Sequence, residues 1–113
     1  MTLQERLIGE LRVVEDGFEL DVYLNWYRSL PLSCVATLEF TADGEEVPFT
    51  FNGYTLDELR ERWEEYWFVL DPATLRVRRG VPKEVHVRLG VRIPYLPHGV
   101  VHVSERLTQI GPV

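Results

Sequence analysis

The chain has 113 residues, 45% of them hydrophobic, and a formal net charge of −6 at pH 7. This length fits one domain with a single hydrophobic core, and the composition is not that of a disordered chain. The negative charge disfavours nucleic acid and anionic membrane surfaces as partners, because both reward clustered Lys and Arg. We expect one domain over residues 1–113, with residues 1–8 and 108–113 at its periphery.

The sequence also bears on the cellular compartment. No apolar run approaches the ~20 residues of a membrane-spanning helix. The N-terminal residues lack the basic start and apolar core of a signal peptide. The single cysteine, Cys34, cannot form an internal disulfide. These features predict a cytoplasmic protein.

The first half of the chain reads as strands in which apolar and polar side chains alternate. A strand is expected over residues 9–14, and a half-buried strand over residues 18–24 follows a Glu-Asp-Gly turn. Two more strands are expected over residues 36–41 and 47–51, joined by an Asp-Gly turn. Pro48 cannot donate a backbone hydrogen bond, so it places the last of these strands at a sheet edge or a bulge.

One helix is expected, over residues 56–65. It begins with the spacing of a capping box at Thr55 and Glu58. Its apolar face would consist of Leu56, Leu59 and Trp63. Such a short helix is not stable alone, so we expect this face to pack against the sheet.

The second half of the chain returns to strand patterns. Strands are expected over residues 67–70, 75–77, 85–93 and 101–107. Within residues 85–93 the odd positions are apolar and the even positions polar or glycine, so the odd side chains should face the core. Seven or eight short strands with a single helix, and no alternation of strands with helices, predict an all-β fold. We expect an antiparallel β-sandwich.

Two loops that interrupt the strand patterns are unusually apolar and aromatic. The first, residues 25–33, includes Trp26, Tyr27, Arg28, Leu30, Pro31 and Leu32. The second, residues 92–99, includes Arg92, Pro94, Tyr95, Leu96 and Pro97. Ordinary loops are polar, so these side chains must be covered either by their own domain or by another protein. We expect the two loops to lie close together.

Each of these loops carries one arginine, Arg28 or Arg92. An unpaired guanidinium in an apolar contact is costly, so each is expected to have a carboxylate or carbonyl partner. Either the arginine forms a structural ion pair within this domain, or it helps to order a loop at a neighbouring active site.

The sequence does not predict a complete catalytic centre. His86 and His102 lie on strands expected to be neighbours and could meet on the outer face, as the centre of a self-sufficient enzyme. No third ligand near them in the sequence completes a zinc-like set, and Cys34 is distant. Neither a nucleophile elbow nor a phosphate-binding glycine loop is present. No metal or cofactor is therefore expected in this chain.

Five motifs, in order, resemble one known family. They are LNWYRSLPLSC (24–34), FTADGEEVP (40–48), YTLDEL (54–59), WFVLDPATL (67–75) and LGVRIPYLP (89–97). Together they are similar to the small, or beta, subunit of bacterial C-glycoside deglycosidases, from about Gly17 to the C-terminus. Five motifs in the right order are specific, whereas one alone would not be.

The resemblance implies a β-sandwich that associates with a larger, TIM-barrel subunit similar to sugar-phosphate isomerases. That large subunit would hold a divalent metal, typically manganese, in a hetero-oligomer. The implied reaction cleaves the carbon–carbon bond between a sugar, oxidised to its 3-keto form, and an aromatic aglycone. This chain alone would be inactive.

The resemblance favours a partner-covered surface at the two loops. Pro-stiffened loops with Tyr and Arg suit an interface because they lose little conformational entropy on binding. One alternative is a free carbohydrate-binding module, with Trp26, Tyr27 and Tyr95 stacking on sugars. The other is the self-sufficient enzyme centred on the two histidines.

Overall fold

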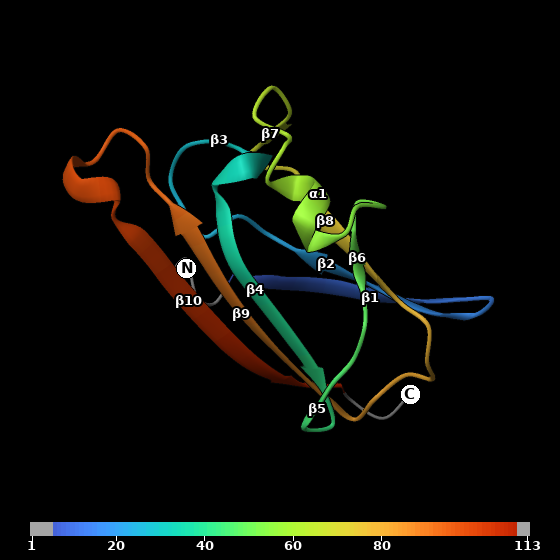
Figure 1. Cartoon of the computed structure of the whole chain (residues 1–113). Helices are drawn as coiled ribbons and strands as arrows, with labels where there is room; N and C mark the ends of the chain where they lie inside the picture. Colours follow the sequence, from blue (N-terminus) through green and yellow to red (C-terminus); the bar gives the residue numbers. More distant parts are fainter. Residues whose placement is uncertain (1–5, 111–113) are drawn as a thin grey trace.

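The computed structural model describes residues 6–110 as three antiparallel sheets (Figure 1). The first sheet has the order β1 (Ile8–Val14), β2 (Gly17–Val22), β8 (Ala73–Val77) and β6 (Thr50–Phe51). The second has the order β10 (Val101–Gln109), β9 (Glu84–Arg92), β4 (Val35–Ala42) and β5 (Glu45–Glu46). The third pairs β3 (Leu30–Pro31) with β7 (Tyr66–Trp67). The remaining elements are the helix α1 (Leu56–Leu59) and two 3-10 turns, Leu32–Cys34 and Pro97–Gly99.

The two four-stranded sheets enclose one hydrophobic core, which confirms the predicted antiparallel β-sandwich. Phe18 of β2 meets Phe40 of β4 across the core, with ring centroids 6.2 Å apart. The alternation predicted for residues 85–93 is also confirmed, because every odd-numbered side chain there is buried. Among residues 6–110, no helix is long and apolar enough to cross a membrane.

The predicted turns have the backbone geometry that their residues favour. Asp43 and Gly44, like Asn52 and Gly53, all have positive φ. Gly17, which follows the first hairpin turn, is required for another reason. A Cβ atom there would lie 1.9 Å from the carbonyl oxygen of Val77 on β8.

The predicted helix over residues 56–65 is wrong in length. The capping box of Thr55 and Glu58 forms, but the α-helix ends at Leu59. The next bonds span only three residues, from Glu61 N to Glu58 O and from Arg62 N to Leu59 O. Only Leu59 of the expected apolar face is buried, so the rest of that face has no packing to hold a longer helix.

Two predicted strands are shorter than expected. Only Thr50 and Phe51 of residues 47–51 pair with β8, since Pro48 cannot extend the ladder. Only Trp67 of residues 67–70 lies in a strand, and its side chain is the single fully buried one of that stretch.

Residues near both ends of the described chain make defined contacts. Leu7 is fully buried in the core, and Arg6 donates hydrogen bonds to the carbonyl groups of Leu24 and Trp26. The last strand includes Thr108 and Gln109. Residues 1–5 and 111–113 lie outside the described residues.

Candidate functional site

The first aromatic loop is tied to the core at its start. Asn25 is completely buried, and its Nδ2 donates a 3.1 Å hydrogen bond to the carbonyl oxygen of Leu89 on β9. The other end of the loop forms β3, where Leu30 lies opposite Trp67 of β7. The loop is therefore held between the β9 sheet and the β7 segment.

The two aromatic loops meet, as the sequence predicted. The indole Nε1 of Trp26 donates a hydrogen bond to the hydroxyl of Tyr95. The guanidinium of Arg28 lies 5.7 Å from the centroid of the same tyrosine ring, a cation–π contact. Trp26 also packs against Tyr27 and His102, with centroid distances of 5.5 and 5.2 Å. These five residues form a unit, here called the aromatic clamp, that locks the loops together.

The predicted interface residues divide into buried and exposed groups. Leu30 and Leu32 are buried in the core of their own domain. Of the two alternatives that the sequence left open, cover by the domain itself is therefore the one found for these two residues. Trp26, Pro31 and Leu96 are half-buried. The exposed members are Tyr27, Arg28, Arg92, Pro94, Tyr95 and Pro97. Only this exposed group presents a large surface to a partner.

Neither predicted arginine forms an intramolecular ion pair with a carboxylate of the described chain. The guanidinium of Arg28 makes a cation–π contact with the Tyr95 ring instead. Arg92 lines a polar recess of about 340 Å³ together with Arg60 and Ser33. Cys34 also lines this recess, and burial raises the pKa of its thiol. A structural ion pair within the domain is thus not what holds Arg28 or Arg92.

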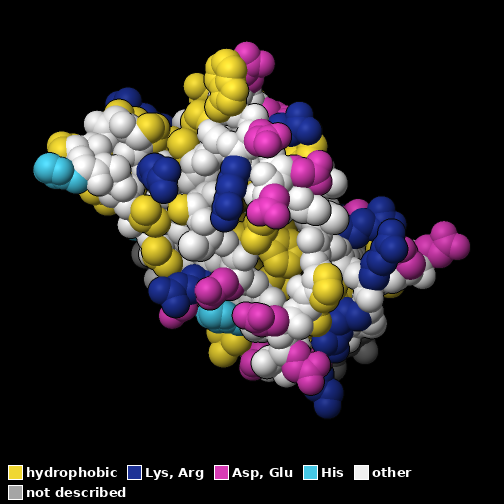
Figure 2. Space-filling view, viewed as in Figure 1, with side chains coloured by type: hydrophobic (Ala, Val, Ile, Leu, Met, Phe, Trp, Pro, Cys, Tyr) yellow, Lys and Arg dark blue, Asp and Glu magenta, His cyan; other side chains and the backbone are white. Residues whose placement is uncertain are grey.

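A second exposed apolar surface was missed by the sequence reasoning. Residues 67–70 were expected to form a compact strand, but Phe68 and Leu70 are exposed, as is Tyr66 beside them. Figure 2 shows apolar side chains gathered over β7 at the top of the molecule and over the 93–100 loop at the left. The available signal was the lack of alternation, because a strand apolar on both faces must be covered on both sides.

The histidines do not form the centre that the enzyme alternative requires. The two strands are neighbours, but His86 lies opposite Leu107 and His102 opposite Val91, five positions further along β9. At about 3.4 Å per residue this separates the histidines by roughly 17 Å, on opposite faces of the sheet. In the part of the chain that is described, no three His, Cys, Asp or Glu side chains are grouped to hold a metal ion. The residues present therefore do not fit a metal centre.

The carbohydrate-binding alternative needs open, flat aromatic faces. Trp26 is half-buried, and its ring is inclined by 55° to that of Tyr27. The guanidinium of Arg28 occupies a face of Tyr95. The three aromatic residues thus form an interlocked group rather than a flat platform.

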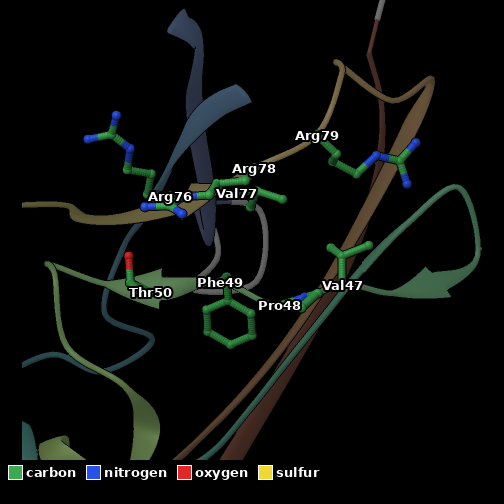
Figure 3. A pocket seen from close by; sticks show the side chains of 8 residues that line it. All are labelled: Val47, Pro48, Phe49, Thr50, Arg76, Val77, Arg78 and Arg79. Carbon is green, nitrogen blue, oxygen red and sulfur yellow. The ribbon is translucent and has the colours of Figure 1, made fainter. Parts of the chain in front are cut away.

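A groove of about 410 Å³ lies away from the aromatic clamp (Figure 3). It opens where β6 and β8 separate beyond the pair Thr50–Arg76, and it has an apolar lining that includes Phe49. Its arginines already have acidic partners. Arg76 is 3.1 Å from Asp16, and Arg79 is 3.4 Å from Asp43. The groove therefore has little unpaired charge with which to attract an anion.

Comparison with known proteins gives a consistent set of relatives. A family model described as C-glycoside deglycosidase beta subunit matches residues 9–95. A C-glycoside deglycosidase beta subunit of Microbacterium trichothecenolyticum is 35% identical and covers 95% of this chain and 94% of the relative. One from Arthrobacter globiformis is 36% identical with the same coverage. A 3'-dehydrocarminate deglycosidase beta subunit of a Microbacterium species is 36% identical over 83% of this chain and 81% of its own.

Proposed function

The chain belongs to the C-glycoside deglycosidase beta subunit family, and from this premise we propose that it is the non-catalytic subunit of a heteromeric carbon–carbon lyase. Its partner is an alpha subunit with a TIM-barrel fold similar to sugar isomerases. The complex acts on a 3-oxo-C-glycoside and releases the aglycone.

The proposed reaction uses the acidity that a ketone gives to its neighbouring carbon. A base removes the proton at C2 of the 3-oxo sugar, the C1–aryl bond breaks by elimination, and the aryl carbon takes up a proton. The name of one relative refers to a 3'-dehydro compound, which supports an oxidised sugar as substrate. We assign the base and a divalent metal, manganese, to the alpha subunit, where the metal would stabilise developing oxyanion charge.

The observation that carries the proposal is the aromatic clamp. Its hydrogen bond and cation–π contact join the two loops, and both Tyr27 and Tyr95 remain exposed. A surface ordered before binding loses little entropy on association, and tyrosine is enriched in the energetic centre of interfaces. We therefore propose that the exposed residues of the clamp and of the 92–97 segment contact the alpha subunit.

Reconstitution tests this proposal. The purified chain, the purified alpha subunit and their mixture are each supplied with a 3-oxo-C-glycoside, and aglycone release is followed by chromatography. The mixture should be active and this chain alone inactive. Turnover by this chain alone, freed of its partner, would contradict the proposal.

A matched pair of variants tests the location of the interface. Tyr27 and Val13 are each 74% exposed, but Val13 lies on β1, outside the aromatic clamp. Tyr27→Asp should impair assembly and reconstituted activity, because it puts a charge into a desolvated contact. Val13→Asp should leave both unchanged.

A further inference from the structure

We propose that the β7 loop, residues 66–71, is the anchor of this subunit and inserts into an apolar recess of the alpha subunit rimmed by Lys and Arg. This inference rests on the proposed function, since it names the surface that holds the two subunits together. It adds a segment that lies outside the aromatic loops.

The β7 loop has three exposed large apolar or aromatic side chains. Leu70 is 80% exposed and Phe68 57% exposed, and Tyr66 beside them is half-exposed. The rings of Tyr66 and Phe68 lie 6.3 Å apart at an angle of 31°, so they form one surface. Contiguous apolar surface of this kind marks interaction sites in soluble proteins.

The backbone of the loop is held by hydrogen bonds although its side chains are exposed. Trp67 is buried, packs edge-on against Phe51 at 5.0 Å, and donates its indole N–H to the carbonyl oxygen of Asp71. The backbone N–H of Asp71 donates a hydrogen bond to the carbonyl oxygen of Phe68, which closes the loop. The backbone N–H of Val69 bonds the Ser29 hydroxyl at 2.9 Å. An anchor fixed in this way loses little conformational entropy on binding.

The charges beside the loop indicate the chemistry of its partner. Glu61 and Glu64 precede it, are exposed, and form no ion pair within residues 6–110. Arg60 and Arg62 of the same segment already contact Asp57 at 3.8 Å and the Tyr54 ring at 4.5 Å. The two glutamates therefore leave unpaired negative charge beside the loop, which the basic rim of a recess complements. A second copy of this chain would instead bring like charges together, on a protein whose net charge is −6.

The β7 loop is also continuous with the proposed interface. Pro31 of the first aromatic loop lies opposite Tyr66, and the Ser29 hydroxyl of that loop accepts the hydrogen bond from Val69. Figure 1 shows β3 and β7 side by side at the same end of the molecule. One face of the alpha subunit can therefore cover both surfaces.

The test measures binding of the full chain to its alpha subunit by calorimetry at fixed salt. Phe68→Ala combined with Leu70→Ala should raise Kd by about 30-fold or more, as truncation of an interface hot spot does. The matched control is Leu107→Ala, because Leu107 is 56% exposed but lies on β10. This control should stay within about threefold of the wild type. Circular dichroism and thermal unfolding confirm that each variant is folded.

Three results would overturn the inference. In the first, the double variant binds as the wild type does and the complex is active, so the β7 loop is not the anchor while the proposed function stands. In the second, the wild-type chain alone dimerises in sedimentation and the double variant is monomeric, so the loop binds a second copy. In the third, the wild-type chain does not bind the alpha subunit, and the proposed function fails as well.

Discussion

Replacing Asn25 by Asp tests how the first aromatic loop is held. Asn25 is completely buried, with Nδ2 on the Leu89 carbonyl oxygen and Oδ1 without a hydrogen-bond partner in the described chain. A protonated carboxyl group has nearly the same shape and can donate its O–H to the same carbonyl. An ionised one cannot donate, and it would be a buried charge facing a carbonyl oxygen. The variant should therefore be stable only where the new carboxyl group is protonated.

The size of the effect follows from linkage. Burial raises the pKa of the introduced carboxyl group in the folded state, while in the unfolded chain it stays near 3.9. The unfolded chain then loses its proton first, so stability falls as pH rises, by about 1.4 kcal/mol per pH unit above pH 4. The loss levels off at the folded-state pKa and can reach about 4 kcal/mol at pH 7.

Urea unfolding at pH 4, 5, 6 and 7, followed by tryptophan fluorescence, measures this loss against the wild type at each pH. Asn52→Asp is the matched control. Asn52 is exposed and its Oδ1 accepts the backbone N–H of Thr74, which a carboxylate can also do. Its stability should not fall as pH rises, because the bond from the Thr74 N–H favours the charged form. A pH-independent difference for Asn25→Asp, or the same pH profile for both variants, would refute the proposal that buried Asn25 holds the first aromatic loop.

Three further predictions follow from other contacts. Gly90→Ala should destabilise the fold by about 1–3 kcal/mol, because the added Cβ would lie 2.5 Å from Thr37 Oγ1, and Thr37→Ala in the same chain should restore stability in urea unfolding. Leu32→Asp should unfold the isolated domain in circular dichroism, since Leu32 is buried; a folded variant would contradict this. The hydrogen bond from Arg76 lowers the pKa of Asp16. The contribution of this pair to the stability of the fold is therefore present above the ordinary pKa of 3.8 and is lost as pH falls through the lowered value. Asp16→Asn should therefore weaken the acid dependence of unfolding below pH 4, and an unchanged dependence would exclude this pair.

The sequence predicted best where one physical requirement acts alone. Along residues 85–93 the alternation is set by burial of one face, and the odd-numbered side chains are buried as expected. The turns at Asp43 and Asn52 followed from residues that tolerate positive φ. The proximity of the two aromatic loops was also expected and is confirmed by the Trp26–Tyr95 hydrogen bond.

The sequence predicted less where two environments, such as a core and an interface, favour the same residue types. A core and an interface both take apolar side chains, so the sequence did not distinguish the buried Leu32 from the exposed Leu70. The strands of the two histidines are neighbours, as predicted, but His102 does not share the outer face with His86, because its position pairs with the buried Val91. The register, which decides the face of every side chain, was not predicted. The helix expected over residues 56–65 stopped at Leu59 because its later residues have nothing to pack against.

The most direct test of the account is amide hydrogen exchange of this chain, measured alone and in complex with its alpha subunit. Complex formation should slow exchange in residues 26–29, 66–71 and 92–97, which line the proposed interface. Residues 105–109, the part of the edge strand β10 that lies away from His102 and the aromatic clamp, should be unchanged. Slowed exchange confined to β10, with the two aromatic loops and the β7 loop unaffected, would contradict it.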